Sequence, residues 1–72
     1  MPDGVVLFYT IHDLFRLDDG LKQRGVDVKA IPAPRELSSD CGSALRFDIS
    51  DLETVQAVVR DLRLHVQGIH EL

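Results

Sequence analysis

The 72-residue sequence has no tryptophan, a single methionine and a single cysteine, Cys41. One cysteine excludes an internal disulfide framework and a zinc site built from several thiolates. It leaves a free thiol, which is typical of a reducing compartment. Long hydrophobic runs are also missing, because stretches such as GVVLFYTI are far shorter than the roughly 20 residues of a membrane-spanning helix.

The sequence also lacks a concentration of positive charge. Its 8 Lys and Arg residues are spread along the chain and outnumbered by 12 Asp and Glu residues. Nucleic-acid binding depends on clustered Lys and Arg, so we expect no nucleic-acid partner. No basic, then apolar leader with a cleavage site is visible. We therefore expect a cytoplasmic protein without a membrane partner.

The length of 72 residues predicts a single domain over residues 1–72. The apolar content of 44% is ordinary for a folded chain. A second helix is expected after Ser50, with an apolar stripe that ends at Leu62. The other expected elements are strands at 4–9, 26–31, 43–49 and 65–72, and a helix at 11–24.

The resulting order, βαββαβ, predicts a ferredoxin-like α+β fold. One antiparallel sheet would carry two helices on one face, in a two-layer sandwich. Both β-α-β crossovers should be right-handed. The alternative is another small two-layer sandwich with a different strand order.

Local signals define the ends of the helices. Thr10 with Asp13, and Ser50 with Glu53, match the capping box at a helix start. Tyr9 and Leu14 could form a hydrophobic staple across the first start. Gly25 fits the left-handed position after the first helix.

One face of the first helix is predicted to be apolar, but Asp18 falls within it. The apolar residues of this face are Ile11, Leu14, Phe15 and Leu21. Asp18 could orient Arg46 or a group of a partner. Alternatively, Leu17 takes the inward place and Asp18 pairs with Lys22 at i+4, which we favour.

The cysteine lies in a connection, residues 32–42, that is longer than the two to five residues usual for a hairpin. The topology brings this connection, the helix start with His12, and His65 to one end of the sheet. Flanking serines and an aspartate favour an accessible thiol. However, a lone cysteine is often a buried small hydrophobe, and strand parity with Leu45 would point Cys41 inward. The residues alone leave both interpretations open.

Neighbours of Cys41 could support a reactive thiol. Arg35 and His12 could supply positive charge to a thiolate. Gly42 leaves the sulfur open to approach and allows a positive φ at the loop-to-strand junction. Ser38 and Ser39 could donate hydrogen bonds to the sulfur, or could simply shape the turn.

No metal or other cofactor is expected. His12, His65 and His70 are too scattered in the sequence to indicate a metal site. A three-ligand site of Cys41, His12 and His65 is conceivable, but topology alone gives no ligand distances, so we do not favour it.

The segment PAPRELSSDCGSALRF (residues 32–47) resembles the signature of the Se/S carrier protein-like family, small bacterial and archaeal domains found alone or attached to TusA-type sulfur-carrier domains. His12 and Gly25 also match recurrent positions of that family. The chain departs from the family at Leu64 and His65, where a small residue and a glycine are usual. The matching residues of the signature are Pro32, Pro34, Arg35, Leu37, Ser38, Ser39, Cys41, Gly42, Ala44, Leu45 and Arg46.

The resemblance implies a sulfur or selenium carrier in which Cys41 holds a persulfide or selenopersulfide. It implies a cysteine desulfurase-like donor, and a selenophosphate synthetase or thiolation enzyme as receiver. Such a carrier is not an enzyme in the strict sense, because no acid–base pair is arranged around the thiol.

The alternative is an interaction or regulatory module with a structural cysteine. Fold alone does not fix function, and exposed strands of such domains can associate edge to edge, so self-association stays open. A thiol oxidoreductase is disfavoured, because the chain has no second cysteine to resolve a mixed disulfide.

Overall fold

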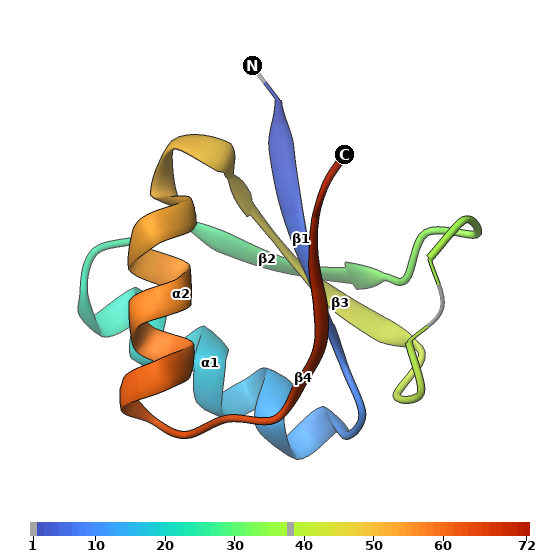
Figure 1. The fold of residues 1–72 in the computed structure, drawn as a ribbon, viewed down its shortest axis with the longest axis horizontal. Coiled ribbons are helices and arrows are strands. Elements are labelled where there is room, and N and C mark those ends of the chain that lie inside the picture. The colour runs from blue at the N-terminus through green and yellow to red at the C-terminus, as the bar shows by residue number, and fades with distance from the viewer. Residues whose placement is uncertain (1, 38) are drawn as a thin grey trace.

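The computed structural model describes residues 2–37 and 39–72, and it has the predicted order βαββαβ (Figure 1). A 3-10 turn, Ile49–Asp51, precedes the second helix. The strands are β1 (Asp3–Phe8), β2 (Val28–Pro32), β3 (Ser43–Asp48) and β4 (Val66–Glu71), and the helices are α1 (Ile11–Gln23) and α2 (Leu52–Asp61).

The four strands form one antiparallel sheet in the order β2-β3-β1-β4. Both helices lie on the same face of this sheet (Figure 1). β1 is central, and its residues are buried from Gly4 to Phe8 because it pairs with β3 on one side and β4 on the other. The ferredoxin-like α+β fold predicted from the sequence is thus confirmed.

The main core lies between the sheet and the helices. The partly buried side chain of Cys41 packs against this core. The buried residues are Val6, Phe8, Leu14, Leu17, Leu21, Val26, Val28, Leu45, Phe47, Val55, Val58 and Leu64.

A second, smaller core lies on the sheet face that carries no helix. Val5, Leu7 and Ala44 are buried there, although no helix or strand of the described residues covers them. Leu37, from the connection between β2 and β3, packs against this cluster together with Ile31. The connection therefore supplies part of the cover that a helix layer would give.

The start and end of α1 follow the predicted caps. The Thr10 hydroxyl accepts a hydrogen bond from the Asp13 backbone N–H at 3.4 Å. Gly25 has a φ of 76°, in the left-handed region that favours glycine. Gly20 lets the helices approach, because a Cβ there would lie 3.1 Å from Val58 Cγ1 of α2.

The predicted apolar face of α1 is partly wrong. Leu14 and Leu21 are buried with Leu17, but Ile11 and Phe15 are 45% and 60% exposed. The buried stripe is rotated toward Leu17 and Gly20, because α2 packs on that flank of α1.

Asp18 takes the second of its two predicted roles. Its carboxylate pairs with Lys22 Nζ at 3.2 Å, and Leu17 occupies the inward position. Arg46 instead pairs with Asp3, whose Oδ2 accepts a hydrogen bond from Arg46 Nε at 2.7 Å.

The predicted capping box at Ser50 is wrong. The Asp48 carboxylate accepts hydrogen bonds from the Ser50 N–H at 2.9 Å and from its hydroxyl at 2.8 Å, so Asp48 caps the 3-10 turn. The bond from the Ser50 N–H, and to a smaller extent the bond from its hydroxyl, lowers the pKa of the Asp48 carboxyl group. α2 starts only at Leu52, and Asp51 precedes it without a side-chain cap.

Of the eight predicted strand ends, only the start at Ser43 is unchanged, and the other seven shift by one or two residues. Tyr9 leaves β1 and is half exposed. Val26 belongs to the turn after α1, where its N–H donates to the Leu21 carbonyl, and β2 starts at Val28. Pro32 closes β2, which is an edge strand and tolerates the missing donor there.

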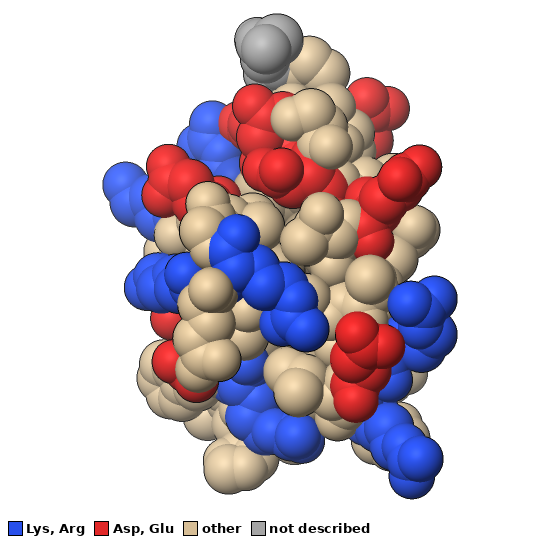
Figure 2. All heavy atoms as spheres, turned by 90° about the vertical axis from the view of Figure 1, so that its left-hand side faces the viewer, with Lys and Arg blue, Asp and Glu red and all other residues tan. Residues whose placement is uncertain are grey.

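The two ends of the chain that the structure describes lie side by side. The Leu72 N–H donates to the Asp3 carbonyl at 2.7 Å, at the start of β1 and the end of β4. Figure 2 shows acidic and basic side chains together on the side that holds the turn after α1, the acidic ones mostly toward the top. Within the described residues, no helix has the length and apolar character that crossing a membrane requires.

Candidate functional site

Cys41 lies in residues 33–42, which we call the thiol loop. The loop is closed at its base by the Ala33 N–H, which donates to the Gly42 carbonyl at 3.2 Å. It passes around the end of the sheet, because Leu37 packs on the helix-free face and Cys41 packs on the helix side. The Cys41 side chain is free and half-buried, so it matches neither a fully buried nor a fully exposed thiol.

The Ser39 hydroxyl ties the thiol loop to the end of β1. It accepts a hydrogen bond from the Phe8 N–H at 3.2 Å and lies 2.8 Å from the Phe8 carbonyl oxygen. It also lies 2.9 Å from the Ser43 carbonyl oxygen and 3.4 Å from Cys41 Sγ. A hydroxyl has one proton to donate, so it serves only one of these three acceptors at a time.

The sulfur itself has a second partner. The Cys41 thiol donates to the Ser43 carbonyl at 3.2 Å, and the Cys41 N–H donates to the Phe8 carbonyl at 3.3 Å. The position of the sulfur is thus fixed by its own backbone, by the following strand and by the end of β1.

Asp40 is held by the start of β4. Its backbone N–H donates to Gln67 Oε1 at 2.9 Å, and Gln67 Nε2 donates to Asp40 Oδ1 at 3.3 Å. The sequence gives no signal for Gln67, because it lies in the weakly patterned last strand and 27 residues from its partner. The start of β4 and the end of β1 therefore meet the thiol loop, as the topology predicts.

Of the other residues predicted to support the thiol, Gly42 has the expected conformation, but Arg35 and His12 do not bind the sulfur. Gly42 has a φ of 77° and an open position where a Cβ would stand, so the positive φ expected at this junction is present. Arg35 and His12 are exposed, and neither forms a hydrogen bond or ion pair with Cys41 in the described part of the chain. Ser38 lies outside the described residues.

The histidines do not gather around the sulfur with other ligands. His12 lies in the first turn of α1, His65 just before β4 and His70 in β4, and all three are exposed. Across residues 2–37 and 39–72, no group of three or more His, Cys, Asp or Glu side chains could hold a metal ion.

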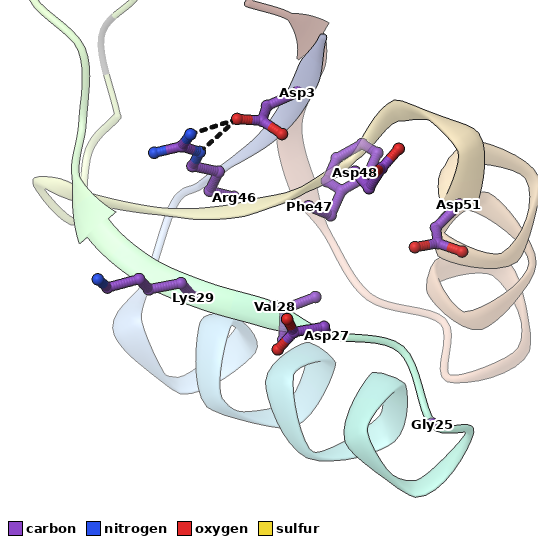
Figure 3. A pocket seen from close by; sticks show the side chains of 9 residues that line it. All are labelled: Asp3, Gly25, Asp27, Val28, Lys29, Arg46, Phe47, Asp48 and Asp51. Carbon is purple, nitrogen blue, oxygen red and sulfur yellow. Dashed lines mark hydrogen bonds and ion pairs between the residues drawn. The ribbon is translucent and has the colours of Figure 1, made fainter. Parts of the chain in front are cut away.

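A hollow of the described surface lies at the other end of the sheet (Figure 3). It adjoins the start of β1 and the end of β3, whereas Cys41 adjoins the end of β1 and the start of β3. Some polar side chains of this lining already have partners. Asp3 pairs with Arg46, and the Asp48 carboxylate caps the 3-10 turn. The lining residues are Asp3, Gly25, Asp27, Val28, Lys29, Arg46, Phe47, Asp48 and Asp51.

Comparison with known proteins identifies a family that includes this chain. The model of the family described as "Putative Se/S carrier protein-like" matches residues 3–71, nearly the whole chain. Neither a curated protein nor a solved structure matches the chain. The matched segment includes the complete sheet, both helices and the thiol loop. The chain therefore belongs to the Putative Se/S carrier protein-like family.

Proposed function

We propose that the protein carries sulfur or selenium, with Cys41 as the covalent acceptor. The observation that carries this proposal is the hydrogen-bond arrangement at the sulfur, which has a partner for each state of the residue. In the free thiol, Cys41 donates to the Ser43 carbonyl, and the Ser39 hydroxyl is available to the Phe8 carbonyl. Membership of a Se/S carrier-like family supports the same function.

Loading would remove the thiol proton and leave the Ser43 carbonyl without its donor. The Ser39 hydroxyl lies 2.9 Å from that carbonyl and can turn to it. The Phe8 carbonyl keeps the N–H of Cys41, so no acceptor is left unpaired. With a deprotonated sulfur, the same hydroxyl can donate to Sγ instead.

The transfer step is a thiol exchange without net oxidation. The Cys41 thiolate attacks the outer sulfur of a cysteine persulfide on the donor protein, and its proton goes to solvent. A new bond forms between Sγ and the outer sulfur, while the old sulfur–sulfur bond breaks and the donor cysteine leaves as a thiolate. Delivery to the receiver repeats this exchange in the opposite sense.

Residues around the thiol have distinct roles in this proposal. Gly42 leaves the approach to the sulfur open, and Ser39 follows the state of the sulfur by turning its hydroxyl. Arg35 and His12 are solvent-exposed. The Arg35 guanidinium, and the His12 imidazole in its protonated form, would pair with the outer sulfur anion once it extends beyond the loop. Ser38 is proposed as a further hydrogen-bond donor from the sequence alone.

The partners follow from the chemistry. The donor is a cysteine desulfurase-like enzyme that forms a persulfide, and the receiver is a selenophosphate synthetase or a thiolation enzyme. The protein would act as a stoichiometric carrier in the cytoplasm and would need no cofactor of its own.

The test is intact-mass measurement after the reduced protein is incubated with a cysteine desulfurase and L-cysteine. We expect a gain of one sulfur atom, which a reductant reverses and which Cys41→Ser lacks. If the wild-type protein gains no sulfur and a small thiol reagent also modifies Cys41 slowly, the carrier function is rejected.

A second candidate is an interaction module with a structural cysteine. The packing of Cys41 against the helix-side core favours it. In that case Cys41→Ala would lower the free energy of unfolding, and the desulfurase would transfer no sulfur to the wild-type protein. The same mass measurement therefore separates the two functions.

A further inference from the structure

The start of β4 is irregular where it meets the thiol loop. The pairing of β1 with β4 changes register there, since Leu7 faces Gly68 whereas Phe8 faces Val66. Gln67 is therefore the extra residue of a β-bulge and pairs with no residue of β1. Bulges beside functional sites commonly redirect a side chain, so the direction of Gln67 is informative.

The bulge directs Gln67 to the thiol loop. Val66 and Ile69 both pack against the helix-side core. Residues three apart point to opposite faces of a regular strand, so both can pack there only because one residue is inserted between them. The inserted Gln67 then binds Asp40, the residue that precedes Cys41.

Asp40 and Gln67 have complementary polar groups. The Asp40 N–H donates to Gln67 Oε1 at 2.9 Å, and Gln67 Nε2 donates to Asp40 Oδ1 at 3.3 Å. Only one orientation of the amide gives both bonds, because its oxygen cannot donate and its nitrogen cannot accept. Residue 40 is thus held through its backbone and its side chain at once. We call these two residues the Asp40–Gln67 pair.

The Asp40–Gln67 pair lies next to the anchor of Cys41 itself. The Asp40 N–H is bound by β4, and the following N–H, that of Cys41, donates to the Phe8 carbonyl of β1 at 3.3 Å. Two consecutive residues of the loop are therefore held by two neighbouring strands. We propose that Gln67 is a positioning residue, which through Asp40 holds the sulfur in the orientation that transfer requires. This inference rests on the function proposed above.

Orientation matters because of the transfer step. As the bond from Cys41 Sγ to the outer sulfur of the donor forms, the donor's sulfur–sulfur bond breaks and its cysteine leaves as a thiolate. The attacking sulfur must lie in line with the bond that breaks, so a loss of alignment lowers the rate. A persulfide fixed on a folded protein cannot adjust its approach as a free reagent does. The half-buried Cys41 therefore depends on its loop for alignment.

The chain offers a matched control for the Asp40–Gln67 pair. Gln23 Nε2 donates to Asp19 Oδ2 at 2.9 Å, in another exposed contact between a glutamine and an aspartate. Gln23 ends α1 close to Gly25, which lines the hollow at the opposite end of the sheet from Cys41. Loss of this contact should not reach the thiol.

The experiment measures by intact mass how fast a cysteine desulfurase with L-cysteine loads the full-length protein and its variants. Gln67→Ala removes the Asp40–Gln67 pair without a change of charge, and Gln67→Glu sets a second carboxylate against Asp40. Adding Asp40→Asn to Gln67→Glu restores one amide and one carboxylate with exchanged positions and the wild-type charge. Gln23→Ala is the control. Alkylation by iodoacetamide measures how the thiol reacts with a free reagent.

We expect Gln67→Ala and Gln67→Glu to load about tenfold more slowly than the wild type, since misalignment slows transfer. The double variant should recover most of the rate, and Gln23→Ala should load like the wild type. Iodoacetamide should alkylate Gln67→Ala at least as fast as the wild type, because a looser loop exposes the half-buried thiol more often. A purely structural pair would leave the loading of a folded variant unchanged.

Equal loading of Gln67→Ala and the wild type would overturn the positioning role while the carrier function stands. A double variant as slow as Gln67→Glu would overturn it too, as would slower alkylation of Gln67→Ala, because the effect would then not come from the orientation of the thiol. Failure of the wild type to take up sulfur would reject the carrier function, and the positioning role with it.

Circular dichroism spectra and thermal melts establish that each variant is folded before its loading is measured. Gln67→Asn replaces Gln67→Ala if that variant unfolds. Its side chain is one methylene shorter, so it cannot make both hydrogen bonds to Asp40 and should load as slowly as Gln67→Ala.

Discussion

Ser39 shows how one small side chain can organise a loop. Its hydroxyl contacts the backbone of Phe8 through both N–H and carbonyl, and it also reaches Ser43 and the sulfur of Cys41. Without it, the Phe8 N–H would lose its partner at a partly buried position. Serine is suited to this place, because a hydroxyl accepts and donates at the same time.

Replacement of Ser39 should therefore cost stability. We expect Ser39→Ala to lower the free energy of unfolding by about 1–3 kcal/mol, the usual cost of an unsatisfied buried donor. Urea denaturation measures this difference. Ser39→Thr, which retains the hydroxyl, should lose less; equal stabilities of wild type and Ser39→Ala would show that the hydroxyl is dispensable.

At the scale of elements, both helices end with the same hydrogen-bond pattern. After α1 the N–H groups of Gly25 and Val26 donate to Lys22 and Leu21, and after α2 the corresponding donors are Arg63 and Leu64. This is the Schellman motif, which needs a left-handed residue at its centre. Gly25 meets that need without strain, but Arg63 has a φ of 53° and a Cβ to accommodate. Between α2 and β4, Arg63 is thus the residue that takes the conformation favoured by glycine.

Arg63→Gly should stabilise the protein. We expect a gain of about 0.5–1 kcal/mol, because relief of the left-handed strain outweighs the larger entropy of glycine in the unfolded chain. Chemical denaturation gives the value. Arg63→Ala is the control, since it removes the charge but keeps the Cβ; an equal gain in Arg63→Ala would attribute the effect to the side chain.

The elements were predictable where the signal is local. The caps at Thr10 and Gly25 and the order of strands and helices depend on neighbouring residues and on periodicity. The capping box at Ser50 failed because Asp48, two residues earlier, binds the same serine. Ile11 and Phe15 were predicted on the apolar face but are exposed, because a helical wheel shows the apolar face of a helix and not the side on which α2 packs.

The candidate site was predictable only in part for the same reason. The motif identifies Cys41 and the loop around it, and topology brings that loop to the starts of α1 and β4. The two hydrogen bonds between Asp40 and Gln67 join residues far apart in the sequence, and no local pattern predicts them. The proximity of Ser39 to Phe8 is likewise a property of the folded chain.

At the scale of the whole molecule, the thiol loop connects the two cores. Leu37 packs on the cluster of Val5, Leu7 and Ala44, while Cys41 packs on the helix side. The loop is thus anchored on both faces of the sheet. Its position depends on packing at one face as well as on hydrogen bonds at the other.

Truncation of Leu37 should make the Cys41 thiol more accessible, although the two side chains pack on opposite faces of the sheet. We expect Leu37→Ala to lower the free energy of unfolding by about 1–2 kcal/mol, less than for a fully buried leucine. Cys41 should also react several-fold faster with iodoacetamide, because the loop opens more often. Leu72→Ala is the control; an unchanged alkylation rate in a destabilised Leu37→Ala would show that the two anchors are independent.

The pairing of Leu72 with Asp3 has a consequence for how the domain can be attached to other structures. Both ends leave the sheet together, at the pole opposite the thiol loop (Figure 1). A linker, a second domain or a solid support joined at either end would extend away from Cys41. Tethering can therefore raise the local concentration of the domain near another protein without covering the Cys41 thiol.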